Sequence, residues 1–371
     1  PERLSVDIGP VIDAEAKAGI EKHIQAMRDK GRNVYQVAIA DGEEIKRGTF
    51  VMPTLIELDS FDELQREIFG PVLHVVRYKR KEIDQLIGQI NASGYGLTLG
   101  VHTRIDETIA KVIDNVNAGN VYVNRNIVGA VVGVQPFGGE GLSGTGPKAG
   151  GPLYLYRLLS TRPTDAIEQS FVRGDKLAAP DVRLRDAMSQ SLTALKTWAD
   201  GNKFSELSAL CTQFAAQSQS GITRQLAGPT GERNSYAILP REHVLCLAEV
   251  EGDLLTQLAA VLAVGGSAVW PETELTKALF PRLPKEIQAK IKRVADWTKD
   301  DVVFDAVLHH GDSDQLRAVC QQVAQRGGAI VGVHGMSQGE TAIALERLVI
   351  ERALSVNTAA AGGNASLMTI G

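Results

Sequence analysis

The feature that most restricts the fold of this chain is a stretch rich in glycine and proline at residues 135–152. Seven glycines and three prolines occur there. Proline lacks an amide hydrogen and glycine weakens helices and strand interiors, so the stretch predicts a loop. A glycine-rich loop is typical of places where the main chain approaches a ligand or another backbone closely. Regular structure must therefore lie on either side of it.

One motif inside this loop, Gly139-x-Gly141-x-x-Gly144, matches the fingerprint of dinucleotide-binding turns. That fingerprint requires a strand before it and a helix that opens on it, so that the pyrophosphate meets the helix N-terminus. Residues 145–152 contain further glycines and two prolines, which break helices. We therefore interpret the match as accidental and do not predict a phosphate site here.

Composition narrows the class of protein. A length of 371 residues suggests about two domains, and 44% hydrophobic with 22% charged residues is ordinary for a globular protein. The net charge of −5 gives no electrostatic reason to expect binding to nucleic acid. Cys211, Cys246 and Cys320 are too scattered for a disulfide framework, which favours a reducing, cytoplasmic location.

Strands and helices are predicted to alternate in the first half of the chain, which is typical of an α/β layered fold. Asp13 is expected to cap a helix that carries Ile20 and Ile24 on its apolar face. A capping box at Ser60 and Glu63 predicts a short helix that ends before the Gly-Pro pair at 70–71. Further helices are expected at 81–93 and after Thr103, and strands at 35–40, 49–58, 72–78, 97–102, 121–123 and 127–134.

The second half predicts a parallel, Rossmann-like sheet. A polar segment with two prolines at 161–180 is interpreted as a linker, and two helical stretches follow it. Alternation then predicts strands near 236–239, 244–247, 267–270, 305–309 and 329–333, with helices at 254–264, 285–294 and 315–325. His309 and His310 are adjacent in a strand and point to opposite faces, so no metal site is expected.

Four motifs in the first half follow one another in an order that resembles the aldehyde dehydrogenase family. They are Glu67-Ile-Phe-Gly-Pro-Val, Gly94-Tyr-Gly-Leu-Thr-Leu-Gly, Ala118-Gly-Asn-Val-Tyr-Val-Asn and Pro136-Phe-Gly-Gly-x-x-x-Ser-Gly. The resemblance covers about residues 1–160 and implies the C-terminal part of a catalytic domain. Within the family, residues 143–154 resemble the L-glutamate γ-semialdehyde (pyrroline-5-carboxylate) dehydrogenases.

The resemblance implies roles for five residues. Glu67 would hold the nicotinamide ribose of NAD, and Phe69 would pack beside it. Gly150 and Gly151 would form an anchor loop whose main-chain N–H groups bind the substrate α-carboxylate, since backbone donors suit a carboxylate. Phe137 would line the aldehyde tunnel. The residues by themselves also allow a solvated Glu67 and core positions for Phe69 and Phe137.

Aldehyde oxidation of this kind needs a cysteine thiolate and a carboxylate base. The resemblance places both, with the dinucleotide-binding domain, upstream of Pro1, so the chain is interpreted as a fragment without catalytic residues. Cys211 and Cys320 fall in helical patterns and Cys246 in an apolar strand, and all three are interpreted as buried, inert thiols. We expect no dehydrogenase activity from this chain alone.

The second half resembles the cofactor domain of the same superfamily. Residues 228–234 and 262–272 resemble a strand–helix–strand unit that ends in a Lys-Pro pair in working members, where the lysine contacts the cofactor. Trp270 stands at that position here. Because the indole carries no positive charge, we interpret this half as a non-catalytic copy of the cofactor domain that binds no NAD. The alternative is that this half is an independent nucleotide-binding regulator.

Together with the tail, this half resembles the C-terminal end of long-form proline utilisation A. In that family an FAD-dependent proline dehydrogenase and the aldehyde dehydrogenase share one chain. The resemblance implies four parts: the end of the catalytic domain (1–160), the linker (161–180), a non-catalytic lid domain (181–354) and a docked C-terminal motif (355–371).

It also implies NAD as cofactor, glutamate γ-semialdehyde as substrate and channelling of that substrate from the FAD-dependent step. The expected partners are the upstream domains of the parent chain and further copies in a homo-oligomer. Peripheral membrane association of the parent is a further implication, and nucleic acid is not expected to bind. The alternative is a stand-alone structural or interaction module without activity.

Overall fold

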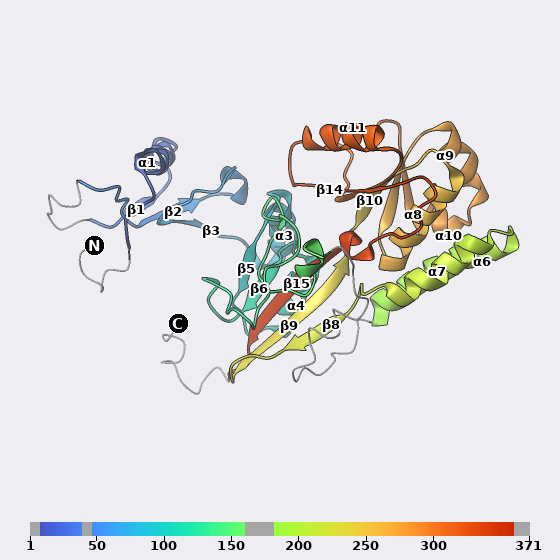
Figure 1. The fold of residues 1–371 in the computed structure, drawn as a ribbon. Helices are drawn as coiled ribbons and strands as arrows, with labels where there is room; N and C mark the ends of the chain where they lie inside the picture. The colour runs from blue at the N-terminus through green and yellow to red at the C-terminus, as the bar shows by residue number, and fades with distance from the viewer. Residues whose placement is uncertain (1–7, 39–46, 160–181, 360–371) are drawn as a thin grey trace. The chain divides into compact units, whose positions relative to one another are not determined.

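The chain divides into two compact units, residues 1–93 and 94–371 (Figure 1). The computed structural model describes residues 8–38, 47–159 and 182–359. The predicted linker at 161–180 lies outside the described residues, as does most of the predicted C-terminal motif. In the described part of the chain, no helix combines the length and apolar character that crossing a bilayer requires.

The first unit packs a helix against a small mixed sheet. As predicted, Asp13 caps that helix, and its carboxylate accepts a hydrogen bond from the Ala16 N–H at 2.8 Å. Ile20 and Ile24 then face the sheet and form a core with Ile56. The elements are α1 (Ala14–Asp29), the sheet β1-β2-β3 made of β1 (Val34–Gln36), β2 (Thr54–Leu58) and β3 (Val72–Val76), then η1 (Phe61–Glu63), η2 (Arg80–Glu82) and α3 (Ile83–Ala92).

The helix predicted after Ser60 is only one 3-10 turn. The capping box between Ser60 and Glu63 does form, but Leu64 already leaves helical geometry. Five of the six residues at 65–70 are exposed. A short helix without a buried face is marginal, so the chain continues as a loop up to the Gly-Pro pair.

The second unit contains two five-stranded sheets. One has the order β5-β6-β15-β9-β8, and the other, entirely parallel, has the order β12-β11-β10-β13-β14. The first sheet contains β5 (Thr98–Val101), β6 (Asn120–Val123), β8 (Thr223–Leu226), β9 (Glu232–Pro240) and β15 (Val349–Asn357); the second contains β10 (His243–Leu247), β11 (Ser267–Pro271), β12 (Ile291–Val294), β13 (Ala306–His310) and β14 (Gly332–Met336). The predicted α/β class with a parallel sheet is confirmed, but the strand expected near 236–239 in that sheet is β9, which belongs to the first sheet and pairs antiparallel with β15 and β8.

Helices cover the parallel sheet, and α8 is buried along nearly its whole length. Trp270 on β11 is 0% exposed and packs in the same core as Leu254 and Leu258 of α8. The remaining elements of this unit are α4 (Asp106–Asn115), α6 (Val182–Gly201), α7 (Ser205–Gln217), α8 (Glu251–Val264), α9 (Glu274–Leu279), α10 (Lys285–Gln288), α11 (Ser313–Ala324), the short strands β4 (Tyr95–Gly96) and β7 (Glu140–Gly141), and the 3-10 turns η3 (Leu155–Arg157), η4 (Phe280–Arg282) and η5 (Leu345–Leu348).

Two predicted elements of this unit are wrong. The single helix expected at 285–294 is the short α10 followed by β12, because Ile291 pairs with Ala268 at the sheet edge and tertiary pairing overrides local propensity. The strand expected at 127–134 is a loop. Val128 and Val132 are 92% and 98% exposed, so these β-branched residues have no sheet surface to pack against.

Strand β15 joins the end of the described chain to its first half. It pairs in parallel with β6, from Ala353 opposite Asn120 to Val356 opposite Val123, and antiparallel with β9 (Figure 1). Its residues alternate between buried and half-buried. The strand runs three residues past the predicted boundary at 354, because both neighbours continue its ladder. The predicted lid domain and catalytic part therefore share one sheet.

Candidate functional site

The glycine-rich stretch is a loop, as predicted, and its two ends meet. Phe137 and Ala149 form an antiparallel bridge in which the Phe137 N–H donates to the Ala149 carbonyl at 3.0 Å and the reverse bond measures 2.9 Å. The bridge brings Phe137, Gly150 and Gly151 together. Phe137 is half-buried. The three residues predicted to bind substrate are thus neighbours.

The two anchor-loop glycines differ in what their amides do. The Gly151 N–H donates to the Lys148 carbonyl at 3.0 Å, which closes a turn. Gly150 is exposed at a φ of 72°, and among the described residues no acceptor bonds its N–H. A Cβ on Gly151 would lie 2.7 Å from Oε1 of Glu351, so glycine permits a close approach there. Gly150 is the outward-facing donor of the pair.

Lys148 is a buried cation directly before this turn. It is 2% exposed, and its ammonium group donates to Oδ1 of Asn120 at 3.1 Å and to the Gly138 carbonyl. Burial lowers the pKa of Lys148 to about 8, although Glu351 and Glu140 act to raise it. A buried charge is tolerated when it is paired and hydrogen-bonded, and the loop supplies only one of these two carboxylates, that of Glu140.

The opposite charges come from β15. Oε2 of Glu351 accepts the Lys148 main-chain N–H at 2.7 Å, and its Oε1 accepts the Tyr236 hydroxyl at 2.5 Å. The guanidinium of Arg352 lies 3.6 Å from the carboxylate of Glu140, which belongs to the loop. Burial raises the pKa of both glutamates, against these favourable contacts. The buried Lys148 and the half-buried Glu140 thus each face opposite charge from one strand.

The start of the loop is also tied to the C-terminal strands. The side-chain amide of Gln135 donates to Oε1 of Glu232 at 2.7 Å, to Oδ1 of Asn234 at 3.0 Å and to Oγ of Ser355 at 3.2 Å. Arg125 joins this group through an ion pair of 2.9 Å to Glu232. Neither this network nor Glu351 was singled out from the sequence, because both depend on partners about 100 or more residues away.

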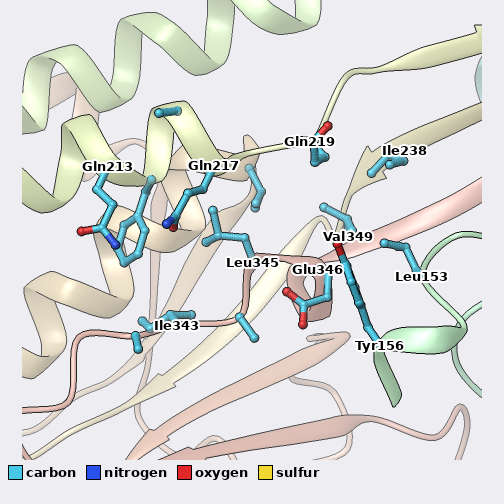
Figure 2. A pocket seen from close by; sticks show the side chains of 15 residues that line it. Leu153, Tyr156, Gln213, Gln217, Gln219, Ile238, Ile343, Leu345, Glu346 and Val349 are labelled. Atoms are coloured by element: carbon cyan, nitrogen blue, oxygen red, sulfur yellow. The ribbon is translucent and has the colours of Figure 1, made fainter. Parts of the chain in front are cut away.

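The segment that follows the loop enters the core of the parallel-sheet half. Leu153 and Tyr156 are buried there and line a cavity of about 490 Å³. Figure 2 shows their side chains facing this cavity opposite Gln217 of α7 and Leu345 of η5. The loop is therefore held on both sides by residues from the second half of the chain.

Glu67 and Phe69, the predicted cofactor residues, belong to the first unit, whereas the three substrate residues belong to the second. Both lie in the loop after η1 and are exposed, Phe69 by 85%. A core position for Phe69 is therefore excluded in this structure.

The cysteines do not provide a reactive thiolate in the core. Cys211 and Cys246 are buried, and burial raises the pKa of Cys211 to about 11 and that of Cys246 further. Cys320 is exposed, so its predicted burial is wrong. It faces outward because Val319 and Val323 form the inner face of α11. Among the described residues no cluster of three or more metal-ligating side chains occurs.

The parallel sheet has a topological switch point between β10 and β13, where doubly wound folds bind nucleotides. Helix α8 begins there with Glu251 and Asp253 in its first turn. Oδ1 of Asp253 accepts the Gly339 N–H at 3.0 Å, and Nε2 of His310 lies 2.7 Å from the Glu340 carbonyl. Carboxylates and a crossing loop thus occupy the place where a pyrophosphate would meet the helix.

Comparison with known proteins shows what each part of the chain is similar to. The profile described as "Aldehyde dehydrogenase family" matches residues 1–162. Over these residues, which carry the four motifs, the chain is similar to that family.

Over its whole length the chain matches the C-terminal portion of proteins named bifunctional protein PutA. It is 62% identical to the one from Klebsiella aerogenes, over 98% of this chain and 28% of that protein. The 1-pyrroline-5-carboxylate dehydrogenase of Bacillus cereus strain B4264 is 36% identical over 44% of this chain and 31% of that protein. The structure of Proline Utilization A from Corynebacterium freiburgense, at 20% identity and a TM-score of 0.54, covers 88% of this chain and 29% of that chain and shares the fold. The chain thus spans little more than a quarter of the length of the first of these relatives.

Proposed function

We propose that this chain is part of a bifunctional proline-catabolic protein and takes part in the NAD-dependent oxidation of L-glutamate γ-semialdehyde to L-glutamate. FAD would serve the proline dehydrogenase of the complete protein and not this chain. The observation that carries the proposal is the Phe137–Ala149 bridge, which gathers Phe137, Gly150 and Gly151 beside an exposed main-chain donor. The similarity to a 1-pyrroline-5-carboxylate dehydrogenase supports it, because that similarity covers 44% of this chain.

The substrate α-carboxylate would accept a hydrogen bond from the Gly150 N–H. Gly151 lets the turn pack against Glu351, and Phe137 would line the path of the aldehyde. In the first unit, Glu67 would accept hydrogen bonds from the nicotinamide ribose, and the exposed ring of Phe69 would pack beside the nicotinamide. NAD, when bound, would supply the acceptor for the hydride that leaves the aldehyde carbon.

The nucleophilic thiolate and the base that activates water would come from outside this chain. Cys211 and Cys246 are buried with raised pKa values, so neither supplies a thiolate near neutral pH. Cys320 lies on the outer side of α11, in the parallel-sheet half. The chain alone is therefore proposed to be inactive.

The second half would act as a non-catalytic lid that helps to channel the semialdehyde from the first enzyme to the second. The pairing of β15 with β6 supports this role, because it places both halves in one sheet. We further propose contacts with the upstream domains, a homo-oligomeric state and a cytoplasmic location, with peripheral membrane association of the complete protein. A stand-alone structural module is the competing function, and it predicts no effect of site variants on turnover.

The complete protein is the material for the direct test. We expect it to reduce NAD when given L-glutamate γ-semialdehyde, measured by NADH absorbance, and we expect the 371-residue chain alone to give no NADH. A complete protein that folds and binds NAD but does not oxidise the semialdehyde would refute the proposed function. NADH production by the chain alone would refute the external nucleophile.

Replacing Glu67 with alanine in the complete protein should weaken the use of NAD by about 10–100-fold, since a charge-assisted hydrogen bond to the ribose is lost. The measurement is the KM for NAD at saturating semialdehyde. Gln65→Ala, an exposed change in the same loop, is the matched control and should leave this KM unchanged. Equal KM values for both variants would remove Glu67 from the cofactor site.

The parallel-sheet half is predicted to bind no NAD, because Glu251 and Asp253 already occupy the N-terminal turn of α8 and would repel phosphate. Titration calorimetry of the complete protein with NAD should therefore give one site per chain. A second site that persists in the Glu67→Ala variant would favour the alternative of a nucleotide-binding regulator.

A further inference from the structure

The carboxylate of Glu351 lies directly beneath the anchor loop. Glu351 is 6% exposed, and its two oxygens accept the Lys148 N–H and the Tyr236 hydroxyl. Oε1 also lies 2.7 Å from the point that a Cβ would occupy if residue 151 carried a side chain. One side chain of the second half thus touches both ends of the Lys148–Gly151 turn.

The hydrogen bonds of the other main-chain amides in this turn show the effect of the Glu351 contact. The Ala149 N–H bonds to Phe137 and the Gly151 N–H bonds to Lys148, both through main-chain carbonyls. With the Lys148 N–H held by Glu351, three of the four successive amides have acceptors inside the protein. The remaining one, that of Gly150, is the exposed donor. The Glu351 contact therefore fixes which amide faces outward.

A neutral side chain could not replace this carboxylate without loss. The buried ammonium group of Lys148 has neutral oxygens of Asn120 and Gly138 as its hydrogen-bond acceptors, and Glu351 is the foremost influence that favours its charged form. Removing this negative charge leaves Glu140 as the remaining carboxylate that favours the buried cation, and the reduced compensation destabilises the conformation around it. The loop would then exchange its present conformation for others.

We propose that Glu351 is a positioning residue for the substrate site, which holds the Lys148–Gly151 turn so that the Gly150 N–H faces the substrate carboxylate. The inference rests on the proposed function for the identity of that carboxylate. Tyr236 supports Glu351 through its hydroxyl, and it comes from β9, the strand next to β15. Substrate binding is thereby coupled to the docking of the C-terminal strands.

The test compares Glu351→Gln with Asp305→Asn in the complete protein. Asp305 is the control, because it is a half-buried carboxylate that accepts main-chain N–H groups from Glu242 and His243 and lies outside the loop. Glu351→Gln should raise the KM for semialdehyde by about 10–100-fold while kcat changes by no more than about 3-fold. The KM for a short aliphatic aldehyde without a carboxylate should stay the same, as should both KM values of Asp305→Asn.

A second readout is independent of activity. Hydrogen–deuterium exchange of a peptide that covers residues 148–153 should become faster in Glu351→Gln and remain unchanged in Asp305→Asn. Tyr236→Phe removes only the hydroxyl, and it should change exchange and KM in the same direction by a smaller amount. It serves in place of Glu351→Gln if that variant does not fold.

The outcomes separate the two proposals. Unchanged exchange at 148–153 in both Glu351→Gln and Tyr236→Phe overturns the positioning role, whatever the substrate. Equal KM increases for semialdehyde and for the aldehyde without a carboxylate also overturn it, because the effect would then be general. A wild-type protein that does not oxidise the semialdehyde refutes the proposed function alone, and the exchange result still decides whether Glu351 holds the loop.

Discussion

Replacing Gly151 with valine is expected to raise the KM of the complete protein for semialdehyde by about 100-fold or more, with no change in the Kd for NAD. The first added carbon would lie 2.7 Å from Oε1 of Glu351 and 3.1 Å from the Lys148 carbonyl. Neither neighbour can withdraw easily, since Glu351 is held by Tyr236 and the carbonyl closes the turn. The turn itself must move, and the Gly150 donor moves with it.

The matched control for this change is Gly332→Val. Gly332 begins β14, and a Cβ there would meet no atom within 4 Å, so valine suits the strand. Steady-state kinetics with semialdehyde and calorimetry with NAD measure both variants. A Gly151→Val protein with a wild-type KM for semialdehyde would exclude the anchor loop from substrate binding. A loss of NAD binding in the same protein would indicate a general loss of structure.

Truncating Trp270 to alanine should lower the free energy of unfolding of the parallel-sheet half by about 3–5 kcal/mol. Its indole is 0% exposed and packs in the core formed with α8 and β10. Alanine leaves a large cavity that close-packed neighbours cannot fill. Urea unfolding of the 371-residue chain, followed by circular dichroism, measures the difference.

Trp270→Phe is the graded control, since it keeps an aromatic ring at the same place and should cost less than the alanine variant. The Trp270 variants also distinguish a core position for this side chain from a position in a cofactor site. If Trp270 lined a cofactor site instead of the core, alanine would change the stability by less than about 1 kcal/mol, as expected for exposed positions. A Trp270→Lys variant should lose stability without gaining NAD binding.

Local patterns predicted much of the regular structure. The Asp13 cap, the apolar spacing of Ile20 and Ile24 and the alternation in the second half each describe a property of neighbouring residues, and the corresponding elements form. The same patterns failed where tertiary contacts decide. The β-branched residues at 127–134 lie on the surface without a partner strand, and Ile291 joins a sheet edge although its local pattern is helical.

The candidate site was predicted only in part. The order of the glycine-rich motifs singled out Phe137, Gly150 and Gly151, and the structure brings them together through one bridge. The roles of these residues and of Glu67 and Phe69 stay predictions until the variants are measured. The charged residues that hold the loop, Glu351 foremost, were not predicted, since a glutamate in an amphipathic strand carries no local sign of a partner.

By itself, the sequence determined that residues 135–152 form a loop and that the second half contains a parallel sheet. The loop follows from the backbone freedom of its glycines, and the sheet follows from the short-range periodicity of apolar residues. The tertiary structure alone decided which amide of the loop faces outward. That choice depends on a hydrogen bond between residues 203 positions apart, Lys148 and Glu351, and on the insertion of β15 between β6 and β9. Contacts at that separation form only when the two halves fold into one sheet.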